Sequence, residues 1–250
     1  MMINFIQNQH RYFYTKNDLF YSKNKKNILP WFIANVMVRI LSGLIFLILK
    51  FRGPVIKNYR PHIVQPNLIV SLTSYPARIK TVWMVIDSLF RQSVCSEGIY
   101  LYLSENEFPN KENDLPKELL LQVKYGLNIV FVKDNFRSHK KYYYSFDNFP
   151  TKKVITVDDD LYYDNDLIFS LLKLNKEYPN SICCSNASLI YGNEGSKALY
   201  RDWKRLKNGN GPSNLVLPIG FGGVLYPEPG KFHRNILHSV AFMELAPSAA

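Results

Sequence analysis

The sequence contains little cysteine and lacks several common catalytic motifs. Its three cysteines, Cys95, Cys183 and Cys184, give no disulfide framework and favour a reducing, cytosolic setting. It has no GxxxxGK[ST] phosphate loop, no GxGxxG turn after the first predicted strand and no GxSxG elbow. These absences argue against P-loop NTPases, dinucleotide-binding enzymes and α/β-hydrolases. None of the five histidines has a His or Cys partner at a zinc-binding spacing.

Acidic residues are almost missing from the first 60 positions. Residues 1–60 hold ten Lys or Arg residues and one acid, Asp18, whereas residues 61–250 hold 21 basic and 19 acidic residues. The net charge of +11 therefore belongs mainly to the N-terminal arm. The remainder is nearly neutral, and the arm is rich in aliphatic rather than stacking side chains, so we expect no nucleic-acid partner.

The arm contains an apolar run over residues 28–51, which is long enough to cross a bilayer. Its polar residues fall near one face at helical spacing: Asn35, Arg39, Ser42 and Lys50. Basic residues flank both ends, which gives a spanning helix no orientation bias but suits an amphipathic helix lying beside anionic lipids. We expect a surface-lying helix at the cytoplasmic face of the inner membrane. A single transmembrane span and a helix packed on the next domain are the alternatives.

Pro54 and Pro61 mark residues 53–66 as a linker, after which short apolar runs alternate with segments of helical spacing. The predicted strands are 68–72, 99–103, 127–132, 154–157 and 181–185, and the predicted helices are 82–90, 115–126, 139–149 and 166–178. This alternation predicts an α/β domain over residues 61–250, with a doubly wound, mainly parallel sheet flanked by helices. Ligands of such sheets bind beyond the carboxyl ends of the strands.

Three consecutive carboxylates, Asp158, Asp159 and Asp160, follow the β-branched run 154–157. Desolvated like charges repel, so the cluster is expected at the exposed carboxyl end of its strand, holding a positive ligand. Carboxylate oxygens suit Mg²⁺ or Mn²⁺, here together with an anionic ligand. The alternative is a helix N-cap with extra acids, since Asp164 and Asp166 begin the next helix.

Six segments of the chain occur in the same order in bacterial GT-A-fold, family-2-like glycosyltransferases, which build capsule, lipopolysaccharide or other surface glycans. The chain resembles these enzymes through this ordered set. The segments are SLTSYPARIKTVWMVIDSL (71–89), LYLSENEFP (101–109), LPKELL (115–120), VKDNFRSHKKYY (132–143), VITVDDDLYY (154–163) and GFGGVLYPEPG (220–230). The resemblance covers roughly residues 66–249 and implies a GT-A-type fold. It also implies a UDP- or GDP-sugar donor and a glycan or lipid-linked acceptor.

The resemblance implies roles for particular residues. The acidic cluster corresponds to the DxD-type motif, with Asp158 and Asp160 binding Mn²⁺ or Mg²⁺ and Asp159 contacting ribose or sugar. The nucleoside would lie against Thr73, Tyr75 and Arg78. A metal held by Asp158 and Asp160 would act as the catalytic Lewis acid, which makes Asp160 the candidate catalytic residue.

A basic pair and a glycine-rich turn complete the implied site. Lys140 and Lys141 would face the nucleotide, although a solvated helix face also accounts for them. The glycine-rich turn consists of Gly220, Gly222 and Gly223 and would lie beside the sugar and acceptor. A strand bulge would explain these glycines equally well. Trp203 falls where the acceptor loop of this fold usually lies, or is a packing aromatic.

In the resembling enzymes, LAPSA is followed by two acids and a tryptophan that include the catalytic base, whereas this sequence stops at LAPSAA (245–250). We therefore expect a chain that is incomplete at its C-terminus and binds donor better than it transfers sugar. The main alternative is a membrane-associated, nucleotide-sugar-binding module with impaired catalysis. A sugar nucleotidyltransferase is another alternative, but its glycine-rich basic loop is missing after the first strand.

Overall fold

The computed structural model describes residues 28–54, 63–190, 203–206 and 211–231. The chain divides into two compact units, Met1–Val55 and Ile56–Ala250. The linker and the boundary that the sequence suggests at residue 60 fall largely on residues 55–62, outside the described part of the chain.

The described part of the first unit contains a long helix, α2, which runs from Ile28 to Arg52. The N-terminal apolar helix predicted from the sequence is thereby confirmed. Its 21-residue segment Phe32–Arg52 contains an 18-residue window with a mean hydropathy of 2.3, so the helix is long and apolar enough by length and composition to cross a membrane. Large apolar side chains three and four positions apart are exposed along it: Val36, Ile40, Leu44, Leu47 and Phe51.

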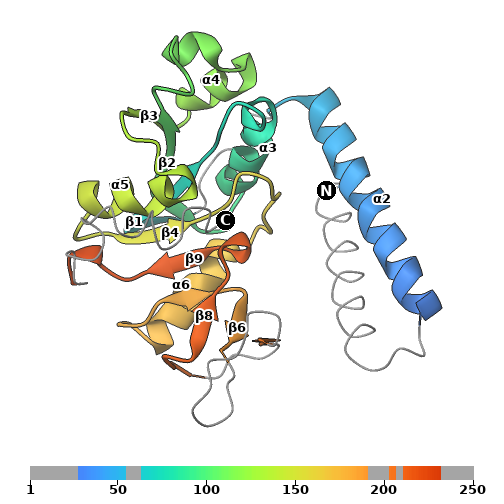
Figure 1. Cartoon of the computed structure of the whole chain (residues 1–250), viewed down its shortest axis with the longest axis vertical. Coiled ribbons are helices and arrows are strands. Elements are labelled where there is room, and N and C mark those ends of the chain that lie inside the picture. Colours follow the sequence, from blue (N-terminus) through green and yellow to red (C-terminus); the bar gives the residue numbers. More distant parts are fainter. Residues whose placement is uncertain (1–27, 55–62, 191–202, 207–210, 232–250) are drawn as a thin grey trace. The chain divides into compact units, whose positions relative to one another are not determined.

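The second unit is built on a six-stranded sheet with the order β3-β2-β1-β4-β9-β5 (Figure 1). The bounds are β1 Val64–Thr73, β2 Cys95–Ser104, β3 Leu127–Val132, β4 Lys153–Thr156, β5 Cys183–Cys184 and β9 Val224–Tyr226. The pairs β1–β2, β1–β4 and β2–β3 are parallel, whereas β9 is antiparallel to both β4 and β5. The predicted α/β class, with a mostly parallel sheet and flanking helices, is confirmed at this level.

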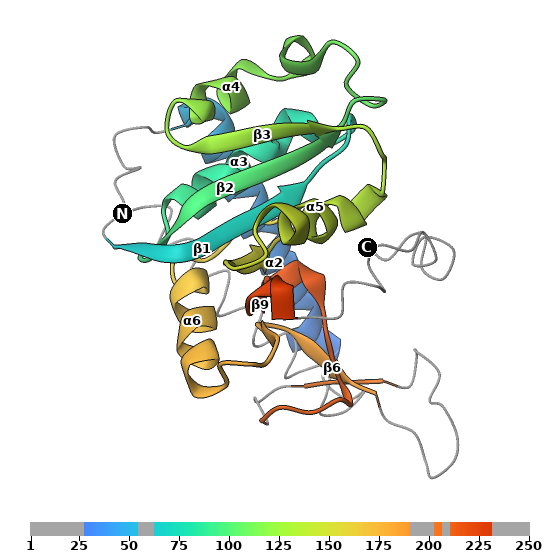
Figure 2. The same ribbon diagram turned by 90° about the vertical axis from the view of Figure 1, so that its left-hand side faces the viewer.

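Helices cover both faces of the sheet (Figure 2). Their bounds are α3 Ile79–Phe90, α4 Lys117–Val123, α5 Lys140–Asn148 and α6 Leu167–Glu177. On one face, Phe146 of α5 packs against Ile69 of β1 and Val154 of β4. Neighbouring side chains on β1 point to opposite faces, so the fully buried Leu68 and Val70 serve the other face. Burial on both faces explains the continuous apolar runs of the central strands.

Short elements complete the second unit. A small sheet with the order β7-β6-β8 contains β6 Ala187–Leu189, β7 Lys204–Arg205 and β8 Val216–Pro218. The described residues also form the 3-10 helices η2 Lys111–Asp114, η3 Arg137–His139, η5 Gly220–Gly222 and η6 Pro229–Lys231. The sequence did not predict β9 or the small sheet, because strands of two or three residues leave no measurable alternation.

The strand order reverses at β1. From β1 the chain moves outward through β2 to β3, and it then returns to place β4 on the other side of β1. The loops that follow β1 and β4 therefore leave the sheet side by side at their carboxyl ends. In open α/β sheets this is the position where a crevice forms and ligands bind.

Candidate functional site

The acidic cluster lies at this reversal point. Pairing between β1 and β4 extends to Ser71 and Thr156, and the Val157 N–H donates one further hydrogen bond to the Ser71 carbonyl at 3.0 Å. Asp158, the first acid, follows at once, where the ladder has ended. Three carboxylates can stand together here because the chain has left the sheet and supplies them with cationic and hydroxyl partners.

Asp159 is the most buried of the three acids and binds the loop that follows β1. Its carboxylate accepts a hydrogen bond from Ser74 Oγ at 2.6 Å and another from Arg78 Nη1 at 2.8 Å. Arg78 Nη1 also lies 3.1 Å from Asp160 Oδ2, and its guanidinium lies 5.5 Å from the centre of the Tyr75 ring. The hydrogen bond to Asp159 raises the pKa of Arg78. Arg78 thus joins two of the acids to an exposed aromatic ring.

Asp158 has a separate cationic partner, Lys141 of α5, whose Nζ forms an ion pair with Asp158 Oδ1. Gly220 lies beside this pair: a Cβ there would be 3.6 Å from Lys141 Nζ and 3.8 Å from both carboxylate oxygens of Asp158. At Gly220, the glycine-rich turn therefore borders the ion pair without a side chain that would contact it. The Asp158 N–H donates to Tyr163 Oη at 2.8 Å, which fixes the backbone under the carboxylate.

Tyr163 connects the acidic cluster to the rest of the site. Its ring is 5% exposed, its hydroxyl lies 3.4 Å from the Phe221 carbonyl, and its N–H donates to Ser88 Oγ at 3.0 Å. Burial raises the pKa of the Tyr163 hydroxyl, so it stays a neutral donor and acceptor. Sequence reasoning missed Tyr163 and Ser74, since neither belongs to a charged motif.

We expect the Tyr163→Phe variant to lower the free energy of unfolding by about 1–3 kcal/mol, because the Asp158 N–H loses its acceptor while the ring keeps its shape. Urea denaturation of both proteins measures the difference. Tyr75→Phe, which alters the half-exposed Tyr75 ring, is the control and should change stability by less than about 0.5 kcal/mol. Identical midpoints for wild type and Tyr163→Phe would show that this hydroxyl does not hold the acidic loop.

The structure separates the two lysines that the sequence grouped together. Lys140 is 1% exposed, and its Nζ lies 3.2 Å from Glu107 Oε2 and 2.7 Å from Asn135 Oδ1. Burial lowers the pKa of the Lys140 ammonium, and the charge of Glu107 opposes that shift. Lys140 therefore ties the loops after β2 and β3 together, whereas Lys141 contacts the acidic cluster.

Three other predicted residues are occupied elsewhere. The Thr73 hydroxyl donates to the Tyr102 carbonyl at 2.8 Å, within the sheet. A Cβ at Gly222 would stand 2.0 Å from Asn186 Nδ2, and one at Gly223 would stand 3.2 Å from Leu167 Cδ1 of α6. Gly223 also has a φ of +85°, a conformation that glycine adopts at little cost. These two glycines allow close packing, and Gly220 is the one that borders the acids.

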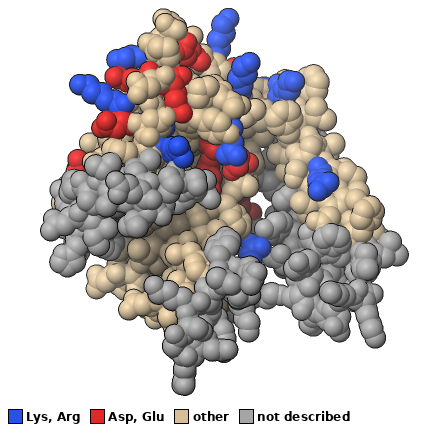
Figure 3. All heavy atoms as spheres, in the orientation of Figure 1, with Lys and Arg blue, Asp and Glu red and all other residues tan. Residues whose placement is uncertain are grey.

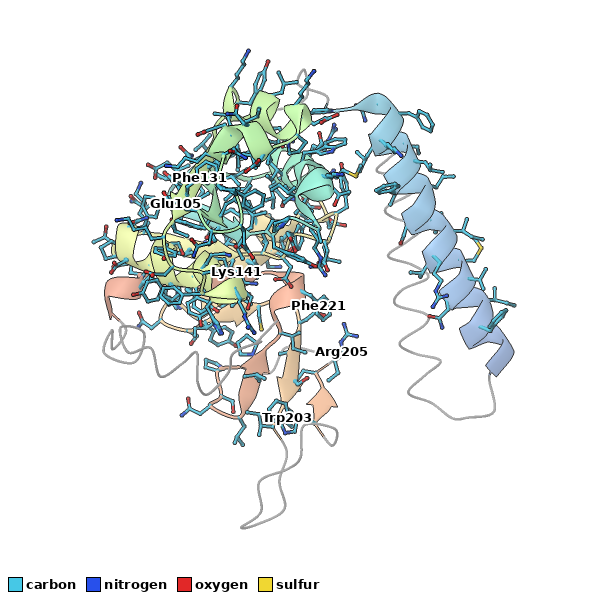
Figure 4. The ribbon with its side chains drawn as sticks, turned by 45° about the horizontal axis from the view of Figure 1, so that its top comes forward. Glu105, Phe131, Lys141, Trp203, Arg205 and Phe221 are labelled. Carbon is cyan, nitrogen blue, oxygen red and sulfur yellow. The ribbon has the colours of Figure 1, made fainter. Side chains whose placement is uncertain are left out.

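The small sheet brings further side chains toward the turn (Figure 4). Arg205 of β7 donates to Asn186 Oδ1 at 2.9 Å, and its guanidinium lies 5.4 Å from the centre of the Phe221 ring. Trp203 is half-buried just before this strand. The segment LAPSAA and the acids expected after it lie outside the described residues.

The acidic cluster offers few carboxylates to a divalent cation. Among the described residues, no group of three or more His, Cys, Asp or Glu side chains could hold a metal ion. Asp159 is buried and accepts hydrogen bonds from both Ser74 and Arg78, whereas Asp158 and Asp160 are more exposed and each contact one basic side chain. Two carboxylates fit Mg²⁺ or Mn²⁺ when substrate phosphates and water complete the coordination shell. The residues present fit a cation that is shared with an anionic ligand.

Comparison with known proteins adds no family: no protein-family model matches the chain, and no curated protein matches it.

Proposed function

We propose that this chain is a GT-A-type glycosyltransferase that transfers a sugar from a UDP- or GDP-sugar to a hydroxyl of a glycan or lipid-linked acceptor. The observation that carries the proposal is the position of the acidic cluster. Asp158–Asp160 stand where the strand order reverses, beside the loop after β1, with Arg78 and Lys141 in contact. A site that combines paired acids and two cations suits a metal-bound diphosphate.

Each side chain has a proposed task. Tyr75 offers an exposed ring to the nucleobase, and Arg78 holds that ring and two acids in one arrangement. Asp158 and Asp160 hold Mn²⁺ or Mg²⁺, which when bound neutralises charge on the departing diphosphate. Lys141 adds a second positive charge on the same side. Gly220 borders this pair and has no side chain that would cover it.

We place the protein at the cytoplasmic face of a membrane. Helix α2 exposes a broad apolar face, and basic residues precede and follow it in the sequence, the combination expected beside anionic lipids. On the face of the second unit shown in Figure 3, basic and acidic side chains are interspersed among the described residues. A nucleic-acid-binding surface usually carries one continuous basic patch. The mixed charges on this face therefore favour a lipid or glycan partner.

Product analysis tests the proposal. The full chain in detergent is incubated with UDP- and GDP-sugars, Mn²⁺ and glycan or lipid-linked acceptors, and the products are identified by mass spectrometry. We expect a free nucleoside diphosphate together with a glycosylated acceptor. In a parallel incubation with pyrophosphate in place of the acceptor, formation of a nucleoside triphosphate and a sugar 1-phosphate would instead identify a nucleotidyltransferase. Nucleotide binding without any transfer would identify a binding module.

A further inference from the structure

The acidic cluster contains three carboxylates but contacts only two basic side chains among the described residues. Arg78 contacts both Asp159 and Asp160, and within the described part of the chain Asp158 has one basic partner, Lys141. The Lys141 and Asp158 side chains are 13% and 28% exposed, whereas Asp160 is 45% exposed. The Lys141–Asp158 pair is therefore partly withdrawn from water. Electrostatic interactions are stronger at such a site than in water.

This pairing sets up a competition. A divalent cation at Asp158 would stand beside the Lys141 ammonium, and two positive charges a few ångströms apart repel strongly at a half-buried site. Metal binding therefore requires Lys141 to give up Asp158. An anionic diphosphate offers the ammonium a new partner at the moment when the metal takes the carboxylate.

The local structure allows such an exchange. The backbone of Lys141 is fixed, since its carbonyl accepts hydrogen bonds from Ser71 Oγ and, at 2.6 Å, from Ser145 Oγ. The Lys141 side chain is a compact charge on a flexible stem, and Gly220, which lies beside its Nζ, has no side chain to hold it in place. Only the end of one side chain has to move.

We propose that Lys141 is an exchangeable counter-ion that makes metal and diphosphate binding interdependent. Without nucleotide it neutralises Asp158 and suppresses metal binding; with nucleotide it transfers to a phosphate oxygen and leaves Asp158 to the metal. This inference rests on the proposed function, because it takes a diphosphate as the ligand. It adds that diphosphate binding strengthens metal binding through Lys141, which the proposed function does not by itself require.

The metal-only arm of the test titrates Mn²⁺ into the full chain without nucleotide and follows free Mn²⁺ by electron paramagnetic resonance. We expect Lys141→Met to bind Mn²⁺ about 5- to 150-fold more tightly than wild type, the usual range of a coupling between sites. Lys141→Arg keeps the charge and should bind as weakly as wild type. Lys141→Gln repeats the neutral change should Lys141→Met fail to fold.

The matched control is Lys152→Met. It also removes one positive charge and breaks an ion pair, that of Lys152 Nζ with Glu97 Oε1 at 2.6 Å, but at the amino ends of the strands. It should leave Mn²⁺ binding unchanged. Equal Mn²⁺ affinity in wild type and the neutral Lys141 variants, or binding by none of them, would overturn the inference.

The second arm repeats the titration with UDP and with GDP, after correction for the metal that each nucleotide chelates in solution. By linkage, a nucleotide that binds should raise Mn²⁺ affinity in wild type, and this increase should shrink about 5-fold or more in Lys141→Met. An undiminished increase would overturn the exchange. Failure of both nucleotides to bind wild type would count against the proposed function, while the metal-only arm would still decide whether Lys141 suppresses metal binding.

Discussion

The Asp158→Asn variant is expected to lose Mn²⁺-dependent nucleotide binding by about 100-fold or more. Asp158 is one of the two carboxylates proposed to bind the cation. Removing a residue that only hydrogen-bonds to a metal ligand already lowers metal affinity by about 10- to 100-fold, so removing a ligand should cost more. The fold should survive, because the bond from Asp158 to Tyr163 uses the backbone N–H. Isothermal titration calorimetry with UDP and GDP measures the loss.

Asp147→Asn provides the matched control for this variant. Asp147 is an exposed residue of α5, and the substitution makes the same chemical change away from the acidic cluster. It should bind nucleotide as wild type does. Wild-type affinity in Asp158→Asn would mean that this carboxylate takes no part in the site.

The second large effect concerns helix α2. Replacing both Ile40 and Leu44 with Asp should abolish binding to vesicles that contain anionic lipid. Both side chains lie on the exposed apolar face, and burying each one contributes about 1.5–3 kcal/mol. Co-sedimentation of the full chain with vesicles gives the bound fraction.

Ser42→Asp serves as both control and discriminator. Ser42 is exposed and hydrogen-bonded to the Val38 carbonyl, near the polar positions of the helix. A surface-lying helix should tolerate this charge, whereas a spanning helix would lose about 2.5–3.5 kcal/mol with an Asp near its centre. Undiminished co-sedimentation of the Ile40→Asp, Leu44→Asp double variant would contradict both forms of membrane attachment.

The sequence was sufficient for the main frame of the second unit. Strand β3 occupies the predicted residues 127–132, and α3, α5 and α6 lie within two or three residues of their predicted positions. These elements are long enough for their apolar period to be read. Strand β9 consists of three residues, Val224–Tyr226, and its place between β4 and β5 is fixed by pairing with residues distant in sequence.

The candidate site was predictable in part for a similar reason. A strand that ends in three acids locates a polar edge, and topology brings the loop after β1 to that edge. The separation of Lys140 from Lys141 was not predictable, because it depends on where α5 begins. Adjacent helical residues point about 100° apart, so only one of the two lysines can face Asp158. Ser74 and Tyr163 carry no charge and gave no signal.

The most direct test of the central claim is calorimetric titration of wild-type protein with UDP and GDP, in Mn²⁺ and again in EDTA. If the acidic cluster holds a metal-bound diphosphate, at least one nucleotide should bind in Mn²⁺ and its binding should fall sharply in EDTA. Equal binding under both conditions, or no binding of either nucleotide in Mn²⁺, would contradict the account.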